Sequence, residues 1–332
     1  MVDSHSTLTS TMTHAVVVTG GAGFIGSHVA EAYLAAGYAV TVLDDLSSGR
    51  PEHVPEGAEL VQADVRSPEA RRLLGTGRFE ILNHHAAQRD VRCSVADPVA
   101  DASTNLLGLL NLLQGAQAGG VRRVVFASSG GTVYTEGATL PIHETAPKLP
   151  VSPYGLAKLA SEHYLAMYAR LYGIEAVALR YSNVYGPRQT AQGEAGVVAT
   201  FARHLLAGEP LVVYGDGEQT RDMVYVTDVA AASLAASRCS LPPLGDIDGC
   251  AYNVGTGVET SVNRLAALMS EVSARVPRIR HAPARLGESR RNALDPGKAQ
   301  RDLCWRPETP LLEGLRATVG WLAQSPTPCV TA

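Results

Sequence analysis

The stretch AVVVTGGAGFIGSHVAEAYLAAG (residues 15–37) decides the fold class. It opens with a β-branched run that stops at glycines, which is typical of a buried strand. From residue 24 apolar residues recur at helical spacing until Gly37, a common helix end. A strand, a glycine turn and a helix in this order begin a parallel, doubly wound α/β sheet, so we expect that architecture here.

The rest of the chain continues this alternation and then changes character. Strands are expected at 39–45, 59–64, 81–87, 122–129 and 176–182, with helices between several of them, notably 100–118 and 154–172. Alternating strands and helices predict a Rossmann-type sheet over residues 14–182. Beyond 183 the pattern is irregular, with a helix near 195–207, strands near 211–215 and 252–257, and helices near 261–274 and 309–323. We interpret 183–323 as a smaller α/β substrate-binding domain interleaved with the first, and 1–13 and 324–332 as loose termini.

The glycine turn itself has the features of a dinucleotide site. Gly20 allows a tight turn, Gly23 lets the backbone approach a pyrophosphate, and Gly26 lets the helix pack close to the sheet. Phosphates would lie at the helix N-terminus, where free N–H groups and the helix dipole favour negative charge. The context of strand, turn and helix makes a bare structural turn the weaker interpretation.

Acidic residues follow the next two strands. Asp44 and Asp45 end the second strand, 24 residues after Gly20, where an acid binds both adenosine ribose hydroxyls and favours NAD over NADP. Arg50 lies nearby and is the one feature against this preference. Asp64 ends the third strand and fits a place beside the adenine, although it is equally well explained as an ordinary strand-end acid.

A tyrosine and a lysine in SPYGLAK (residues 152–158) are the candidate catalytic pair. Tyr154 and Lys158 stand four residues apart and share one helix face. This spacing is common by chance, but beside a dinucleotide site it has a chemical use. A tyrosine has an unperturbed pKa near 10, and a neighbouring ammonium stabilises the phenolate so that it can act as a base near neutral pH. Lys158 can also donate to the nicotinamide ribose.

Composition excludes several other classes of protein. The 332 residues carry a net charge of −4, so a general nucleic-acid or membrane-surface binder is not expected. The five cysteines form no C-x-x-C pair, which indicates free thiols in a reducing, cytoplasmic compartment. No apolar run is long enough for a membrane span, and the N-terminus lacks the apolar core of a secretory signal. Adjacent His84 and His85 would point to opposite faces of a strand, so no metal site is expected.

Several motifs together resemble a known family. HHAAQ (84–88), Asn105, ASSGGTVY (127–134) and the Tyr154–Lys158 pair are similar to those of the extended short-chain dehydrogenase/reductases. YSNVYGPRQ (181–189), YGDGEQTRDMVYVTD (214–228) and RLGE (285–288) narrow the resemblance to nucleotide-sugar enzymes, closest to UDP-glucose 4-epimerases. The resemblance runs from about residue 14 to 323.

The resemblance implies an NAD-dependent isomerase acting on a UDP-hexose, either UDP-glucose and UDP-galactose or their N-acetyl forms. NAD would stay tightly bound. Tyr154 would take the proton of the sugar's 4-hydroxyl while a hydride passes to NAD, and the hydride would return to the opposite face of a 4-keto sugar. A homodimer through the helices near 100–118 and 154–172 is also implied.

The glycine turn and the resemblance together predict which residues contact each ligand. The expected NAD contacts are Gly20, Gly23, Phe24, Ile25, Gly26, Asp44, Asp45, Ser48, Asp64, Val65, His85, Ala86, Ala87, Gln88, Asn105, Ser128, Tyr154, Lys158 and Tyr181. The expected UDP-sugar contacts are Arg89, Asp90, Ser129, Gly130, Thr132, Asn183, Val197, Val212, Tyr214, Arg221, Arg285, Glu288 and Asn292.

Among the sugar-nucleotide contacts, the resemblance assigns specific roles to seven, and one of them, Asn183, matches a residue that donates to the diphosphate or the sugar. Arg221 and Arg285 match the arginines that bind the diphosphate, and guanidinium forks suit phosphate oxygens. Glu288 matches the acid on the uridine ribose, and Val212 with Tyr214 matches the lining of the uracil slot. Asn292 stands where some relatives have a bulky tyrosine beside the sugar's 2-position, so it could leave room for an N-acetyl group.

The chain departs from the family pattern at several positions near the sugar. Gly130 occupies the place of a serine or threonine whose hydroxyl binds the substrate oxygen. We expect Ser129 to supply this catalytic hydroxyl, with Ser128 and Thr132 within reach of the same strand end. Asp90 stands where a serine is commoner. Ser182 and Thr135 replace a phenylalanine and a glycine. Either neutral drift or a sugar other than plain glucose would explain these differences.

Rival functions share the scaffold. A UDP-glucuronic acid 4-epimerase or decarboxylase would need donors for a carboxylate, which Arg89 could provide. A 4,6-dehydratase would need an Asp-Glu pair where Gly131 and Thr132 stand. A non-catalytic NAD-binding sensor is the remaining alternative. Such a protein would be expected to lack Tyr154 or Lys158, and both are present.

Overall fold

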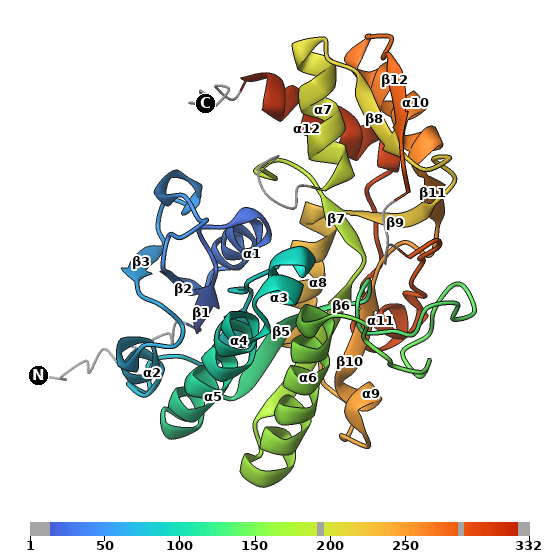
Figure 1. The fold of residues 1–332 in the computed structure, drawn as a ribbon. Helices are drawn as coiled ribbons and strands as arrows, with labels where there is room; N and C mark the ends of the chain where they lie inside the picture. Colours follow the sequence, from blue (N-terminus) through green and yellow to red (C-terminus); the bar gives the residue numbers. More distant parts are fainter. Residues whose placement is uncertain (1–13, 191–195, 285–288, 325–332) are drawn as a thin grey trace, which may run out of the picture.

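The computed structural model describes residues 14–190, 196–284 and 289–324 (Figure 1). Its centre is a seven-stranded parallel sheet with the strand order β10-β6-β5-β4-β1-β2-β3. The strands are β1 (Ala15–Thr19), β2 (Ala39–Asp44), β3 (Glu59–Gln62), β4 (Ile81–His84), β5 (Arg123–Ser129), β6 (Glu175–Tyr181) and β10 (Ala251–Val254). The order reverses between β1 and β4, so the predicted Rossmann-type, doubly wound sheet is confirmed.

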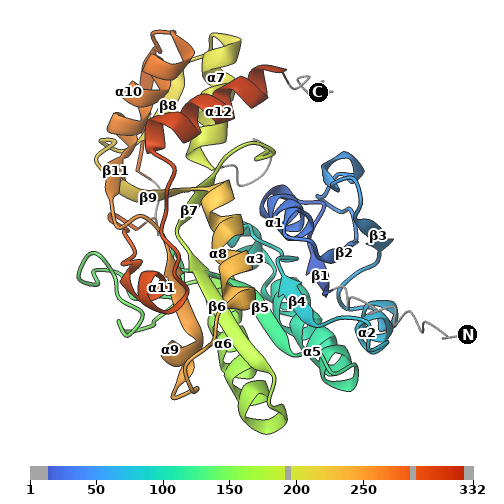
Figure 2. The ribbon, with the colours of Figure 1, turned by 180° about the vertical axis from the view of Figure 1, so that it is seen from behind.

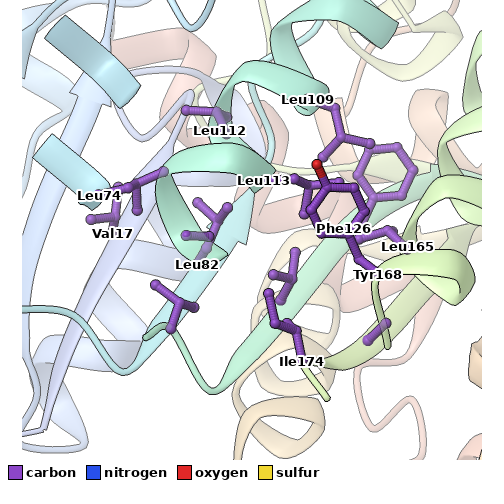
Figure 3. Packing of buried hydrophobic residues seen from close by; sticks show 14 of the residues in the cluster. Val17, Leu74, Leu82, Leu109, Leu112, Leu113, Phe126, Leu165, Tyr168 and Ile174 are labelled. Atoms are coloured by element: carbon purple, nitrogen blue, oxygen red, sulfur yellow. The ribbon is translucent and has the colours of Figure 1, made fainter. Parts of the chain in front are cut away.

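Helices cover both faces of this sheet. They are α1 (Phe24–Ala35), α2 (Pro68–Leu74), α3 (Val91–Ala96), α4 (Pro98–Ala102), α5 (Gly108–Ala118), α6 (Pro153–Tyr172) and α8 (Val226–Arg238), with a short 3₁₀ turn at Pro51–His53. On β1, Val17 packs beneath α2 and α5, as Figure 3 shows, whereas Val16 and Val18 pack beneath α1 and α8. Burial on both faces explains why the strands read as continuous apolar runs.

A second region is built from two small sheets and three helices. One sheet has the order β11-β9-β7, from β7 (Asn183–Tyr185), β9 (Thr220–Tyr225) and β11 (Glu259–Ser261), and the other pairs β8 (Leu211–Tyr214) with β12 (Ile279–Ala282). A separate apolar cluster lies between them and α7 (Val197–Ala207), α10 (Val262–Ser273) and α12 (Leu311–Gln324). Two short helices, α9 (Ile247–Cys250) and α11 (Gly297–Asp302), complete the described elements.

The structure corrects several expected boundaries. The segment near 252–257 is a strand of the main sheet, where Ala251 pairs with Ala178 of β6. Helix α8, which was not expected, covers the same sheet (Figure 2). Its sequence VTDVAAASLAASR has few large apolar residues, so its periodicity is weak. The expected helix over 100–118 is α4, a π-helical turn at Ser103–Leu107 and α5.

The expected loose ends fall almost wholly outside the described residues. Residue 324 is the exception, since it is the last residue of α12. Within the part of the chain that the structure describes, no helix is both long and apolar enough to cross a membrane.

Candidate active site

The glycine turn between β1 and α1 has room for backbone only. Gly20 has a φ of +67°, and a Cβ there would lie 2.7 Å from the backbone nitrogen of Ala86. A Cβ on Gly26 would lie 2.2 Å from the Gly20 carbonyl oxygen. No side chain caps α1, and its first turn carries no acid. The backbone N–H groups of the first turn of α1, from Phe24 and Ile25 onward, are therefore available to an anion. These N–H groups and the glycine turn together form a glycine cradle that fits a pyrophosphate.

The Asp44 side chain forms hydrogen bonds to the glycine turn. It is buried at the end of β2, where its two carboxylate oxygens accept the N–H groups of Ala22 at 3.0 Å and Leu46 at 2.9 Å. Burial raises the pKa of this carboxyl. Each oxygen keeps a further acceptor position, which is what two ribose hydroxyls require. Asp45 is exposed and accepts hydrogen bonds from Ser47, so of the two acids Asp44 is the one against the turn.

Asp64, the acid expected beside the adenine, is already paired with an arginine. Arg66 forms an ion pair with Asp64 at 2.5 Å and holds the pKa of that carboxyl below its usual range. Val65 is buried in the core beneath α5, and Ser48 is exposed. These three residues therefore lie around the ends of β2 and β3 in different environments, and only Asp64 presents a charged group.

The loop after β4 lies directly on the glycine turn. The backbone N–H groups of His85 and Ala86 both donate to Thr19 Oγ1 at 3.2 Å. The His85 ring stacks on Tyr181 and its Nε2 is 3.0 Å from the Tyr181 hydroxyl. Burial lowers the pKa of His85 to about 3, so the ring is neutral, and its Nδ1 is a buried atom without a hydrogen-bond partner.

Arg89 and Asp90 follow in the same loop but have different surroundings. Arg89 is exposed. The Asp90 carboxylate caps α3 by accepting the N–H groups of Arg92 at 2.8 Å and Cys93 at 3.0 Å. Serine and aspartate are both favoured at helix N-caps. The departure from serine at this position therefore has a structural explanation that does not involve the sugar.

Helix α6 positions the tyrosine and the lysine. Ser152 caps the helix by accepting the N–H of Gly155 at 3.1 Å, and Pro153 stands in its first turn, which favours helix initiation directly before Tyr154. Lys158 is 4 % exposed, and its Nζ donates to the Ala127 carbonyl oxygen at 2.8 Å. The same Nζ lies 5.7 Å from the Tyr154 ring centroid. Burial lowers the pKa of Lys158 to about 8.

The surroundings of the end of β5 explain why position 130 carries no hydroxyl side chain. A Cβ on Gly130 would lie 2.4 Å from Leu294 Cδ1, so Leu294 fills the space of a side chain at position 130. Ser128 donates to Glu162 at 2.5 Å, which turns its hydroxyl away. Ser129 is half-buried, and Thr132 Oγ1 is a buried atom without a hydrogen-bond partner. Two hydroxyls therefore remain as candidates.

Thr132 lies close to the catalytic helix. A Cβ on Gly155 would be 2.5 Å from the Thr132 carbonyl oxygen, which places this threonine beside the first turn of α6. Its sequence position, two residues after Gly130, gives no sign of this proximity.

The expected sugar-nucleotide residues come from the second region. Asn183 begins β7 and Arg221 lies on β9 of the same small sheet, while Val212 and Tyr214 lie on β8 and Val197 begins α7. Arg221 donates to the carbonyl oxygens of Thr220 at 2.8 Å and Ser289 at 2.9 Å. Arg285 and Glu288 lie outside the described residues.

Asp222 was missed from the sequence and connects the two regions. It is fully buried, and its carboxylate accepts the N–H groups of Thr256, Gly257 and Leu294 at 2.8–3.1 Å. Leu294 in turn fills the space beside Gly130, and Asn292 is buried two residues before it with Oδ1 unpartnered. The available signal was an acid that directly precedes the apolar run at residues 223–226. Nothing in the local sequence marks Leu294.

Metal chemistry has no candidate centre within the described ranges, where no three His, Cys, Asp or Glu side chains gather. His84 and His85 have separate partners, since the His84 ring stacks on Phe126 and the His85 ring on Tyr181.

Comparisons with known proteins agree with this geometry. Residues 16–255 match the NAD dependent epimerase/dehydratase family. The chain is 44 % identical over 308 residues to the UDP-glucose 4-epimerase of Mycolicibacterium smegmatis, covering 91 % of this chain and 96 % of the relative. A Thermotoga maritima UDP-glucose 4-epimerase structure with UDP-glucose has a TM-score of 0.88 at 42 % identity, covering 93 % and 98 % of the two chains. The Thermus thermophilus UDP-glucose 4-epimerase complex with NAD has a TM-score of 0.86 at 43 % identity, covering 94 % and 99 %.

Proposed function

Because the chain belongs to the NAD dependent epimerase/dehydratase family, we propose that it is a UDP-hexose 4-epimerase that interconverts UDP-glucose and UDP-galactose. One observation carries this proposal: the buried Lys158 ammonium lies beside Tyr154 at the end of β5, and the glycine cradle opens at the end of β1, which only β4 separates from β5. Both lie at the carboxyl edge of a parallel sheet, where such folds bind ligands.

The residues of this chain would perform the proton transfer. Bound NAD supplies the chemistry of taking a hydride from carbon 4 of the sugar and returning it. Tyr154 removes the proton of the 4-hydroxyl and later gives it back. The Lys158 ammonium makes this possible, because a nearby positive charge favours the phenolate. Ser129 hydrogen-bonds the same sugar oxygen, with Thr132 beside it.

The cofactor would be held by the main sheet. The N–H groups at the start of α1 would bind the pyrophosphate, and the Asp44 carboxylate would accept the adenosine ribose hydroxyls. The buried, unpartnered atoms His85 Nδ1 and Asn105 Oδ1 are further polar contacts for it. These orphaned atoms support a polar ligand at this edge, since buried polar groups are normally hydrogen-bonded.

The second region would bind the nucleotide and set the sugar. Arg221, with Arg285, is proposed to bind the diphosphate, and Val212 with Tyr214 to line the uracil site. Asn292 is small and buried next to the segment that packs on Gly130, which supports acceptance of an N-acetyl group at the sugar's 2-position. Firm binding of the unreactive nucleotide would leave the sugar free to turn between the two hydride transfers.

The test is a set of conversions without added cofactor. Purified protein is incubated separately with UDP-glucose, UDP-N-acetylglucosamine and UDP-glucuronic acid, and the products are resolved by chromatography. Conversion of UDP-glucose to UDP-galactose is expected, which would also demonstrate retained NAD. Turnover of UDP-glucuronic acid alone would replace the proposal with a glucuronate epimerase or decarboxylase, and no turnover even with NAD supplied would reject epimerase chemistry. If UDP-glucose reacts and UDP-N-acetylglucosamine does not, the role given to Asn292 is wrong.

We also propose that the protein is a cytoplasmic homodimer. Apolar side chains are exposed along α6 at Leu156, Met167 and Leu171, and at Val99 of the neighbouring α4. Residues 156, 167 and 171 follow helical spacing, so they form one stripe that a second copy would cover. Cys93, Cys239, Cys250 and Cys304 are free thiols, which supports a reducing compartment. Sedimentation of the parent and of Leu171→Asp tests the dimer, and a monomeric parent would reject it.

A further inference from the structure

A buried carboxylate that the proposed mechanism does not use lies on α4. Asp101 is 1 % exposed. Its Oδ1 accepts two hydrogen bonds, from Asn105 Nδ2 at 2.9 Å and from Gln88 Nε2 at 3.0 Å. Its Oδ2 is buried without a hydrogen-bond partner. A carboxyl in such a place is costly unless charge or hydrogen bonds offset its burial.

Burial raises the pKa of Asp101, but its hydrogen-bond partners and the charge of Lys158 favour the ionised form. Asn105 Nδ2 also donates to the Gln88 carbonyl oxygen at 2.9 Å, and Gln88 Nε2 donates to the Asp90 carbonyl oxygen at 3.0 Å. Both amide nitrogens are therefore oriented independently of Asp101, because a carbonyl oxygen can only accept. Each faces Asp101 as a donor, and N–H donors favour the charged form of a carboxyl.

An unusual backbone conformation brings Asn105 to Asp101. Residues 103–107 form a π-helical turn between α4 and α5, and Asn105 lies within it. Such turns are rare and occur frequently at functional sites. Asn105 thus contacts both Asp101 and the loop after β4. The same arrangement leaves the acceptor atoms Asp101 Oδ2 and Asn105 Oδ1 buried and unpartnered.

Lys158 lies on the helix against which the helix of Asp101 packs, and the two opposite charges attract each other. Helix α4 packs on α6, and the attraction of Asp101 raises the pKa of the Lys158 ammonium against the larger opposing effect of burial. The other acid near Lys158, Glu162, is already bound by Arg180 at 2.6 Å and by Ser128. Among the described residues, the other titratable groups around Lys158 are Tyr154 on its own helix and the neutral rings of His84 and His85 at the end of β4.

We propose that Asp101 is a positioning residue for the Tyr154–Lys158 pair: its buried charge keeps Lys158 an ammonium and so sets the pH range in which Tyr154 can exchange its proton. Because this inference rests on the proposed function, its test includes a measurement that needs no substrate. Removing one negative charge lowers the proton affinity of every neighbouring group. Both limbs of the pH profile should therefore move to lower pH.

The sharpest variant is Asp101→Asn. The asparagine oxygen can still accept from Gln88 and Asn105, while its amide nitrogen takes the place of the unpartnered Oδ2, so charge is the main change. We expect the pH profile of kcat/KM to shift down by about one unit, with KM for the UDP-sugar little changed. The control is Asp97→Asn, an exposed cap of the same helix that accepts the N–H of Ala100 at 2.9 Å. Its profile should match the parent's.

The substrate-free measurement is the ultraviolet titration of tyrosinate. The difference between the parent and Tyr154→Phe isolates the ionisation of Tyr154, and the same difference is measured in the Asp101→Asn background. A lower apparent pKa of Tyr154 in that background supports the proposal even if no UDP-sugar is converted. Unchanged titration and an unchanged pH profile overturn it. If Asp101→Asn does not fold, Asp101→Glu and Asp101→Gln have equal length and differ only in charge, and identical Tyr154 titrations for the two would reject the role.

Discussion

In the seven-stranded sheet the site residues come from consecutive strand ends, whereas in the region of the two small sheets they come from segments far apart in the chain. Gly20, Asp44 and His85 each lie at the end of a strand of one repeating pattern. Asn183, Arg221 and Asn292 have no such pattern in common. The first region positions its residues by repetition of strand and helix, and the second by specific long-range contacts.

Buried polar groups carry those long-range contacts. The Asp222 carboxylate accepts hydrogen bonds from the turn after β10 and from Leu294. Such groups are costly when one partner is removed, because the other is left buried without a hydrogen bond. The second region should therefore be more sensitive to single polar substitutions than to the loss of one apolar side chain at its surface.

The largest expected effect is a loss of chemistry without loss of binding. Tyr154→Phe should lower kcat on the order of 10²–10⁴-fold, because the phenol that transfers the proton is gone. The affinities for NAD and for UDP should stay close to the parent's, since the pyrophosphate cradle and the second region are untouched. Conversion assays measure kcat, and calorimetry with UDP and with NAD measures the two affinities. Tyr172→Phe, at the exposed end of the same helix, is the matched control.

The second prediction tests whether the two regions bind different ligands. Asp222→Asn places an amide NH₂ against N–H donors and should lower the free energy of unfolding by about 2–3 kcal/mol. It should raise KM for the UDP-sugar while the affinity for NAD is retained, because the disturbed contacts are to Leu294 and to the turn after β10 and not to the glycine turn. Asp216→Asn is the control, since Asp216 is exposed and paired with Arg290. Equal losses of NAD and UDP affinity would contradict the division between the regions.

The third prediction concerns the pH range of activity. Burial lowers the pKa of Lys158 from its usual 10.5 to about 8. As the pH rises through this value the ammonium loses its proton, so Tyr154 loses the charge that favours its phenolate. The ratio kcat/KM should therefore fall above pH 8, approaching tenfold per pH unit. Lys148→Met, which removes a lysine paired with Asp248, should leave this alkaline limb in place. A flat profile up to pH 10 would reject Lys158 as the group concerned.

The smallest effect is a coupling energy, which tests the contact between the regions. Gly130→Ser should destabilise by about 1–3 kcal/mol, because the new side chain collides with Leu294. Leu294→Ala should cost about 2–5 kcal/mol by leaving a cavity. In the double variant the serine occupies space that the alanine vacates, so the combined loss should be at least about 1 kcal/mol less than the sum. Chemical denaturation of the four proteins measures this coupling. Strict additivity would mean that the two residues do not compete for one space.

The sequence by itself determined the features that arise from local pattern. Alternating strands and helices predicted the sheet, the glycine turn predicted the cradle, and the four-residue spacing of Tyr154 and Lys158 predicted that both side chains share one face of α6. Each of these follows from backbone geometry within about thirty residues, for which the period of apolar residues and the conformational freedom of glycine are sufficient.

Only the tertiary structure decided how the second region meets the first. Leu294 fills the space at Gly130, and β10 and α8 complete the sheet of the first half, although each lies far away in sequence. Asp101 influences Lys158 only because α4 packs on α6. These contacts depend on long-range packing, in which many side chains of similar size and polarity would give the same local pattern. Asp90 makes the same point, since only the structure reveals that its carboxylate caps α3.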